Sequence, residues 1–444
     1  MERRISELLD RAAAAQREGL PDAAARLYDE AAVLCREADD LDAWAKALLG
    51  AASVHLFGAE PGKLPAHLHE VFVRTKDDAT RARLAAALAR TWGYAGRQDR
   101  GVPFAEEALA LAEAVGDPAL IAECLDAALA VHWGPDELEG RRGLASRLDA
   151  VAAHVPDPDA RLKAHLWGLQ VACDLLDLHA IHRNLRALEL LGDESPRALF
   201  FAASRRVMLD LLRGRTDTSA HLLALAAGSA KEAGLSDAWM VLEALRGYAA
   251  AQSGDRAVCA EVAAHAEEFA LAEGITEVCA EAAYLWACSG RLDRAALLVA
   301  TFQGSVLDDL PRDVNWLLVL QCVLEAALAV GDREVIETGA RLLTPYAGRA
   351  VFNAGAVMFH GLTDDTLARA AAVLGDPARA DELRARALAS YERLGATWWR
   401  ERLSNWRPPT KTEDAVARVA HLRPATGGLW VVGSGASPAP LRAL

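Results

Sequence analysis

The chain has 444 residues, of which 52% are hydrophobic, 25% are charged and only 6% are aromatic, and its formal net charge is −14. Hydrophobic residues this abundant exclude a disordered chain, and charges interrupt every apolar stretch before it reaches the ~20 residues of a membrane-spanning helix. The 62 acidic residues outnumber the 48 basic ones, which argues against direct binding of nucleic acid. Seven cysteines without a CxxC pair, and a start that lacks the apolar core of a signal peptide, predict a cytoplasmic protein.

Regularly spaced helices are predicted from residue 4 to residue 406, because apolar residues recur there at i, i+3, i+4 and i+7. Short breaks that open with glycine separate them, at positions 19, 96, 134, 214, 254, 290, 331 and 375. A second glycine follows 20 residues later in several cases, as Gly116 follows Gly96, and that spacing holds one helix of about four turns with its caps. With two further breaks near Gly58 and Asp177, the chain divides into ten helix pairs of roughly 40 residues each.

Each pair needs a small residue where its two helices cross most closely. Five positions after the turn glycine stand Ala24, Gly101, Ser219, Cys259, Ala295 and Ala380, and twelve positions after it stand Ala31, Ala108, Ala226, Ala266 and Ala387. With Trp92 and Trp286 four positions before their glycines, this pattern resembles the tetratricopeptide (TPR) repeat, although the helices are longer than its 34-residue unit allows. The expected fold is therefore all-α: a right-handed α-solenoid of about ten TPR-like helix hairpins over residues 1–406.

Residues 407–444 differ in composition from the repeat region. Pro408 and Pro409 end the last helix, and proline and glycine recur through the segment. The stretch Leu429–Gly433 is the one credible strand. We expect an irregular C-terminal tail with one short strand, which either docks on the last helices or begins a following domain, since a lone strand is not stable.

A resemblance to a known family lies between residues 341 and 400. The stretch Arg341–Arg349 (RLLTPYAGR) and the later Gly375-Asp376-Pro377, Ala387-Leu388, Arg393-Leu394-Gly395-Ala396 and Trp399-Arg400 are similar to the C-terminal helical repeats of large bacterial ATP-dependent transcriptional regulators, the MalT-like and LuxR-type signal-transduction ATPases. The resemblance implies repeats that sense an inducer or a partner protein and hold an ATPase in its resting state. In that family a separate helix-turn-helix domain binds DNA, and this sequence shows neither that domain nor the ATPase.

The candidate binding residues follow from TPR geometry, in which the first helix of each pair lines a concave groove. Positions six and ten before the turn glycine, together with tryptophans near the helix starts, give Arg90, Trp239, Tyr248, Tyr284, Trp316, Gln321 and Glu325. Aromatic rings beside single polar groups suit a peptide or a small effector. We therefore predict a protein-interaction and effector-sensing module that binds a protein segment, a peptide or a small inducer in this groove, without contact to nucleic acid or membrane.

Two alternatives stay open: a standalone TPR scaffold or adaptor, and, with less support, an all-α enzyme with a metal site. The metal candidates are the acidic pairs Asp39-Asp40, Asp77-Asp78, Asp308-Asp309 and Asp364-Asp365, and the histidines His179 and His182 with Asp174 or Asp177. Every acidic pair is expected at a helix start, where carboxylates cap free N–H groups. No phosphate loop, catalytic signature or zinc motif accompanies them, so we predict no enzyme activity, no cofactor and no metal site.

Overall fold

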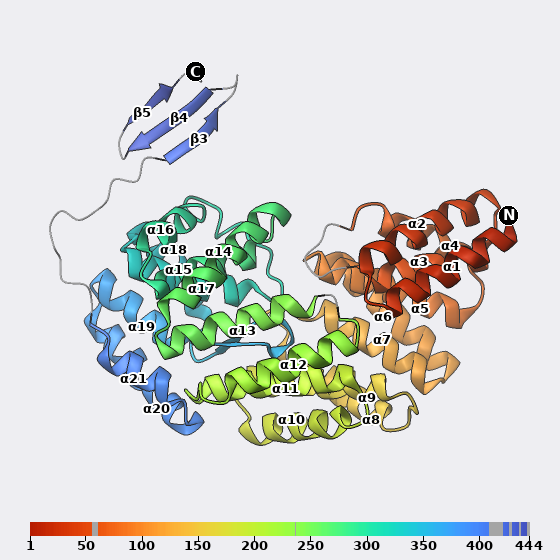
Figure 1. Ribbon diagram of the computed structural model, residues 1–444, viewed down its shortest axis with the longest axis horizontal. Helices are drawn as coiled ribbons and strands as arrows, with labels where there is room; N and C mark the ends of the chain where they lie inside the picture. Colours follow the sequence, from red (N-terminus) through yellow and green to blue (C-terminus); the bar gives the residue numbers. More distant parts are fainter. Residues whose placement is uncertain (56–60, 236, 408–420, 426–428, 435–436, 442–444) are drawn as a thin grey trace. The chain divides into compact units, whose positions relative to one another are not determined.

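The computed structural model describes residues 1–55, 61–235, 237–407, 421–425, 429–434 and 437–441, with side chains up to residue 407. The chain divides into two compact units, residues 1–405 and 406–444. The first unit is built from helices that follow one another in chain order (Figure 1). The predicted all-α solenoid is thereby confirmed.

The helices of the first half are α1 (Glu2–Arg17), α2 (Pro21–Glu37), α3 (Leu41–Ser53), α4 (Leu64–Arg74), α5 (Asp78–Tyr94), α6 (Gln98–Val115), α7 (Pro118–Val131), α8 (Leu138–Ala152), α9 (Pro158–Asp174) and α10 (Leu178–Gly192). Those of the second half are α11 (Pro196–Leu212), α12 (Ser219–Glu232), α13 (Ala238–Ser253), α14 (Arg256–Glu273), α15 (Thr276–Ser289), α16 (Leu292–Ala300), α17 (Trp316–Val330), α18 (Arg333–Leu343), α19 (Thr363–Leu374), α20 (Pro377–Leu394) and α21 (Thr397–Asn405). None of these helices is long and apolar enough to cross a membrane.

The helices pair as the glycine spacing predicts, from α1/α2 to α19/α20, with α21 closing the array. Each helix packs on the next, and first helices of neighbouring pairs also pack on each other, as α5 does on α7 and α15 on α17. Gly254 ends α13 in the left-handed conformation (φ 80°), and Asp255 then caps α14 by accepting the Val258 N–H at 3.1 Å. The break expected near Gly58 lies outside the described residues.

Small residues stand at the helix crossings, as expected. Ala24, Ala31, Ala108 and Ala226 are fully buried. A Cβ on Gly247 of α13 would lie 2.9 Å from Val262 of α14, so that crossing leaves no room for a methyl group. The small residues at these positions therefore follow from the close approach of the paired helices.

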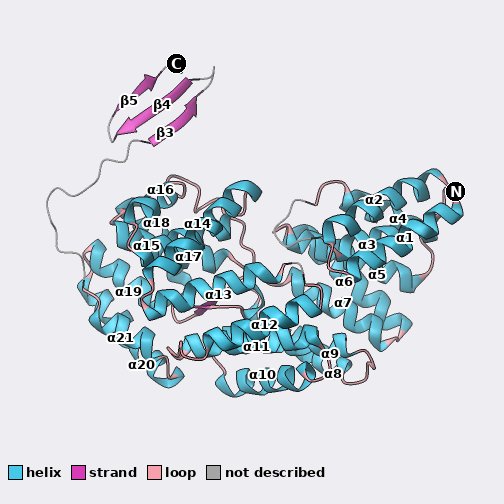
Figure 2. Ribbon diagram, in the orientation of Figure 1, coloured by secondary structure: helices cyan, strands magenta, loops and turns pink. Residues whose placement is uncertain are grey.

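One segment of the array departs from the helical prediction. Between α18 and α19 the chain forms a short 3₁₀ turn, Thr344–Tyr346, and then an antiparallel pair of strands, β1 (Ala350–Phe352) and β2 (Phe359–Leu362), joined through a second 3₁₀ turn, Ala354–Ala356. This hairpin segment, residues 344–362, packs against α9, α11, α17 and α19. Figure 2 shows strand structure in magenta among the helices beside α13. The sequence indicated no strand in this region, and that expectation is wrong.

The described residues of the second unit form three strands, β3 (His421–Ala425), β4 (Leu429–Ser434) and β5 (Ser437–Leu441). They form one antiparallel sheet in the order β3-β4-β5, with Trp430 of β4 opposite Pro424 and Leu441. The single strand expected in the tail coincides with β4, and its two neighbours were missed because their prolines disfavour a strand.

A buried charge network joins the last helices of the first unit. Arg369 of α19 donates to Asp365 at 2.8 Å and to both carboxylate oxygens of Glu325 on α17. Arg402 of α21 approaches Glu325 at 3.1 Å and Asp365 at 3.2 Å. The Asp365 and Glu325 side chains are 0% and 7% exposed, so two carboxylates and two guanidinium groups compensate one another away from water.

Candidate functional site

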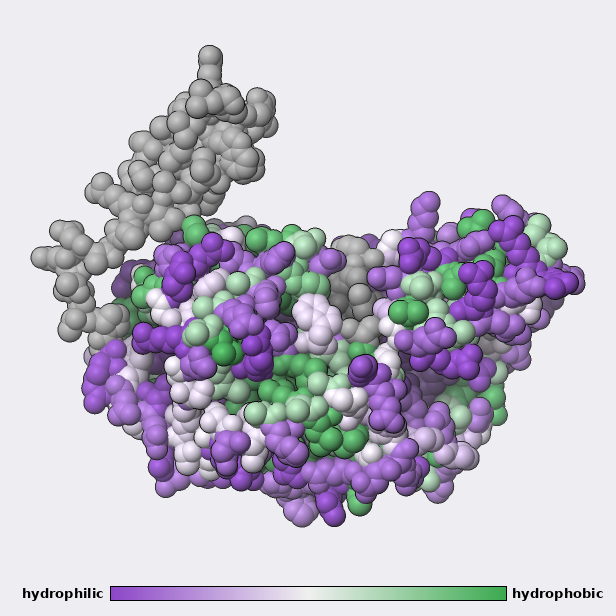
Figure 3. Space-filling view, viewed as in Figure 1, coloured by the Kyte–Doolittle hydropathy of each residue, from purple (hydrophilic) through white to green (hydrophobic). Residues whose placement is uncertain are grey.

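A cavity of about 570 Å³ lies inside the first unit. Its walls come from α9, α11, α13, α14 and α15, and residues 353–357 of the hairpin segment line it as well. Apolar residues gather over α12 and α13 on the face shown in Figure 3. A cavity of several hundred cubic ångströms with an apolar lining is the usual form of a small-molecule site.

Aromatic side chains make up much of the lining. The Trp239 ring of α13 meets Phe269 of α14 edge to face at 5.1 Å, and Trp133 meets Trp167 at 4.5 Å. Trp239 is 46% exposed, an unusual state for a tryptophan. The ring therefore stands at the rim of the cavity, where a bound molecule would contact it.

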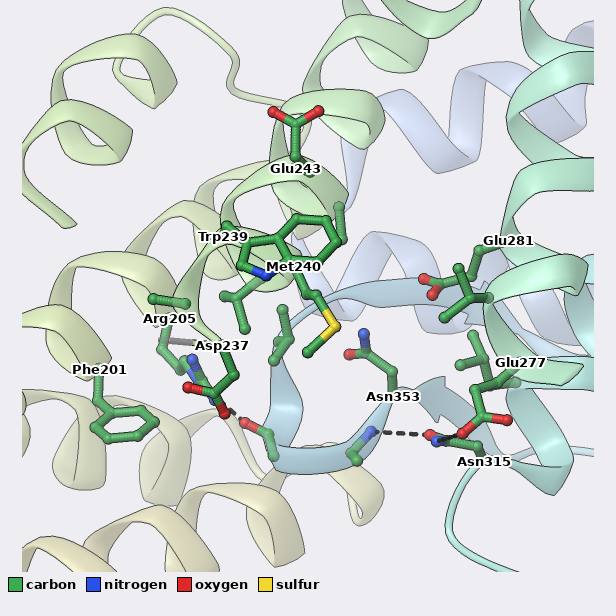
Figure 4. A pocket seen from close by; sticks show the side chains of 18 of the residues that line it. Phe201, Arg205, Asp237, Trp239, Met240, Glu243, Glu277, Glu281, Asn315 and Asn353 are labelled. Atoms are coloured by element: carbon green, nitrogen blue, oxygen red, sulfur yellow. Dashed lines mark hydrogen bonds between the residues drawn. The ribbon is translucent and has the colours of Figure 1, made fainter. Parts of the chain in front are cut away.

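The hairpin segment is held to both sides of the cavity by hydrogen bonds (Figure 4). On one side Arg205 of α11 donates from Nε to the Gly355 carbonyl oxygen at 3.0 Å. On the other, the Ala354 N–H donates to Asn315 Oδ1 at 3.2 Å, and Asn315 Nδ2 donates to Glu277 Oε1 of α15 at 3.2 Å. A continuous path therefore runs from α11 through the hairpin to α15.

The α15 wall carries a carboxylate with no cationic partner among the described residues. The Glu281 side chain is 13% exposed; it accepts a hydrogen bond from the Tyr248 hydroxyl at 3.2 Å, and His360 Nε2 lies 3.7 Å away. Burial raises the pKa of Glu281 to about 7 and lowers the pKa of His360 to about 3, so the imidazole is neutral and supplies no counter-charge. Nearby, burial and the Glu277 charge raise the pKa of Asp313 to about 7.

The α11 wall carries a buried cation that forms no ion pair among the described residues. Arg205 is 3% exposed, and its guanidinium group donates to Gly355 and, from Nη1, to Ser204 Oγ at 2.9 Å. It lies 5.0 Å from the Phe201 ring centre. No ion pair to Arg205 exists within the described part of the chain, and burial lowers its pKa to about 10 although Asp237 favours its charged form.

Two other carboxylates around the cavity are matched by cations. Asp126 accepts from the indole N–H of Trp167 at 2.8 Å and pairs with Arg90 at 3.2 Å and with Lys163 at 3.5 Å. Glu243 of α13 pairs with Arg246 at 2.8 Å. Among the described lining residues, Arg205 on α11, Asp237, whose charge acts on Arg205, and Glu277 and Glu281 on α15 have no oppositely charged partner in an ion pair. Figure 4 shows Arg205 and Glu281 on different sides of the pocket.

Of the seven residues predicted to face a groove, two line this cavity, Trp239 and Tyr248. Tyr248 is 2% exposed and stacks on Tyr284 at 5.5 Å, and its hydroxyl lies 2.9 Å from His360 Nδ1 of the hairpin segment. Gln321 donates to the His360 carbonyl oxygen at 3.1 Å. The chain's own hairpin segment therefore covers the surface that was expected to be open, and the expectation of groove exposure is wrong for Tyr248, Tyr284 and Gln321.

The remaining three are engaged within the fold. Glu325 belongs to the buried charge network, and Trp316 is 3% exposed against Tyr346 of the hairpin segment, at 5.3 Å. Arg90 is tied to Asp126, which itself lines the cavity. Glu325 and Trp316 are thus also corrected from groove positions to core positions.

The metal candidates are explained by capping and ion pairing. Asp40 and Asp77 cap α3 and α5, as predicted. Asp308 lies in a turn rather than at a helix start and pairs with Arg341 at 2.6 Å, and Asp364, in the first turn of α19, pairs with Arg386 at 2.6 Å. His182 contacts Arg213 at 2.6 Å. In the described residues no group of three or more His, Cys, Asp or Glu side chains is placed to hold a metal ion.

The sequence did not single out Arg205, Glu277 or Glu281. Each lies among apolar or alanine residues of a helix, where charged side chains usually face solvent. Glu281 does lie three residues before Tyr284, on the same helix face. A charge on the same helix face as a predicted binding-site tyrosine was the available signal.

Comparison with known proteins shows no matching family model and no matching curated protein. A solved structure described as a circular tandem repeat protein with novel repeat topology and enhanced subunit contact surfaces is similar at 15% sequence identity, covering 90% of this chain and 87% of that one, with a TM-score of 0.13. That TM-score is too low for the likeness to bear on function. The chain is a helical tandem repeat protein, an architecture that commonly presents binding surfaces, and it encloses a cavity.

Proposed function

We propose that this chain is an effector-sensing helical repeat module that binds a small molecule in the cavity between α11, α13 and α15. The observation that carries the proposal is the aromatic-lined cavity of about 570 Å³ with unmatched charges in its walls. Its volume lies within the roughly 300–1,000 Å³ usual for small-molecule sites. The resemblance of residues 341–400 to regulator repeats supports a role in controlling transcription through a partner or an attached domain.

The hairpin segment is the element through which occupancy would be transmitted. Asn353, Gly355 and Val357 line the cavity, while β2 packs on α17 and α19. A ligand that contacts the hairpin stabilises one position of it, and α19 follows because it begins directly after β2. A ligand shifts such an equilibrium only by its difference in affinity for the two states.

The experiment uses 1-anilinonaphthalene-8-sulfonate, an aromatic fluorophore with one anionic group. We expect saturable binding with 1:1 stoichiometry to the full chain. Ala244→Trp places an indole in the cavity, because Ala244 is one of its lining residues, and should weaken binding at least about tenfold by removing the space for the ring system. Ala272→Trp, at an exposed position of α14, is the matched control and should bind as the parent does.

Unchanged binding in Ala244→Trp would place the fluorophore elsewhere and refute the proposed site. Absence of saturable binding to the parent chain would favour the scaffold alternative, in which the repeats act without a small-molecule effector. Circular dichroism spectra of both variants establish that the helical fold is retained.

A further inference from the structure

The charges of the cavity stand out against the rest of the first unit. Several other buried carboxylates meet cations: Glu325 has Arg369 and Arg402, and Asp126 has Arg90. This is the usual rule, since an unpaired charge in a protein interior is costly. The Glu281 carboxylate and the Arg205 guanidinium group break it, and both do so in the wall of the same cavity.

The chain cannot match these two charges with each other, because they come from α15 and α11, on different sides of the pocket (Figure 4). Between them the hairpin segment presents backbone groups and the Asn353 side chain. The Arg205 Nε and Nη1 groups are used by Gly355 and Ser204, and Nη2 has no hydrogen-bond partner in the described residues. The two N–H groups of Nη2 are therefore left as charge-assisted donors for a ligand on this side.

The opposite side offers acceptors. Glu281 uses one oxygen to accept from Tyr248, and Glu277 accepts from Asn315. A carboxylate has about four lone-pair sites, so both groups keep acceptor capacity for an ammonium group. An ammonium ion placed there would also hold Glu281 in its ionised form.

We propose that the ligand is a zwitterion with an apolar body, the chemistry of a short apolar peptide with both ends free, whose ammonium group lies at Glu281 and Glu277 and whose carboxylate lies at Arg205. This inference rests on the proposed function and names the ligand class of the same site. The aromatic residues Trp239, Phe269 and Phe201 would contact the apolar body. A dipeptide, whose two extended residues reach at most ~7 Å between backbone ends, is the smallest peptide of this class.

The test is a matched series of four dipeptides: Phe-Leu with both ends free, its N-acetyl form, its C-terminal amide and the doubly blocked form. Calorimetric titration of the full chain at pH 7, below the ~7.7–8.0 pKa of a peptide amino group and near the pKa of Glu281, about 7, measures the four affinities. Each block removes one charge-assisted hydrogen bond, so each should weaken binding at least about tenfold relative to Phe-Leu.

Two variants assign the ends. In Glu281→Gln the difference between free and N-acetylated peptide should shrink to less than about threefold, while the difference between free acid and amide persists. In Arg205→Met the pattern should reverse. Glu273→Gln, at an exposed position near the end of α14, is the charge-matched control and should keep the parent pattern. Arg205 also holds Gly355, so Glu281→Gln carries the decisive comparison if Arg205→Met fails to fold.

Equal affinity for all four peptides overturns the proposal, and so does a loss caused by only one of the two blocks. If none of the four peptides binds, while the fluorophore binds the parent chain and binds more weakly to Ala244→Trp, the zwitterion proposal is overturned. The cavity then still stands as the site of another effector. Failure of both ligand types refutes the site itself.

Discussion

The buried charge network of α17, α19 and α21 allows one prediction to be worked out in detail. Arg369→Met removes the guanidinium group that donates to Asp365 and Glu325. It leaves two carboxylates, 0% and 7% exposed, with Arg402 as their single cation among the described residues. Breaking a buried ion pair from one side costs about 3–5 kcal/mol, because an uncompensated charge stays in the interior.

Such a loss should be concentrated at the C-terminal end of the first unit. Helical repeats unfold in part as local units, since each repeat contacts mainly its neighbours. Amide hydrogen exchange in α19 and α21, followed by mass spectrometry, is therefore the appropriate measurement. A cost of ~3 kcal/mol or more corresponds to protection lower by about 100-fold or more.

The matched control is Arg379→Met. Arg379 pairs with Glu382 at 2.7 Å on the surface of α20, where the two side chains are 37% and 54% exposed. An exposed pair of this kind is worth at most about 1 kcal/mol, so protection should change less than about fivefold. If the two variants lose the same protection, the network does not stabilise the end of the array and the argument from burial is refuted.

Three further changes test the cavity and the hairpin segment. Glu281→Gln should stabilise the chain at pH 8 by on the order of 1–3 kcal/mol in thermal unfolding. Burial raises the pKa of Glu281 from 4.5 to about 7, so the unfolding free energy of the parent falls as pH rises between these values. An equal dependence of stability on pH in the variant would contradict this. Tyr248→Phe removes a hydroxyl from between Glu281 and His360 and should cost about 1–3 kcal/mol in urea unfolding, whereas no loss would mean these groups find other partners. Gly361→Ala adds a Cβ 2.8 Å from an indole ring of α21 at φ 95° and should destabilise more than Gly116→Ala, where φ is 76° and the space is open; equal costs would show that only backbone strain matters.

The array could be predicted because its signals are local. A turn glycine such as Gly254 and the cap Asp255 act within one break, and small residues at crossings act within one pair. Tyr248 and Tyr284, which occupy the same position before their turn glycines, stack on each other, although both are buried and not exposed in a groove as predicted.

What covers that surface could not be predicted from the sequence. His360 reaches Tyr248 from 112 positions away, and no periodicity within α13 carries information about it. The charges of the cavity were missed for the same reason: whether Arg205 faces solvent or Gly355 depends on a segment 150 residues further along.

The hairpin segment also changes how the array is expected to fold. A solenoid whose repeats touch only their neighbours has short contacts along the chain and unfolds piece by piece. Here Ala356 donates to Gln170 across 186 positions, and Tyr346 donates to Asp136 across 210. During synthesis the α9 and α11 helices are complete long before the hairpin segment leaves the ribosome. The sides of these helices that face the cavity therefore stay exposed to solvent until the segment docks. Docking of the hairpin segment then closes long loops of the chain late in folding, and it joins this segment to the distant repeats that contain Asp136 and Gln170.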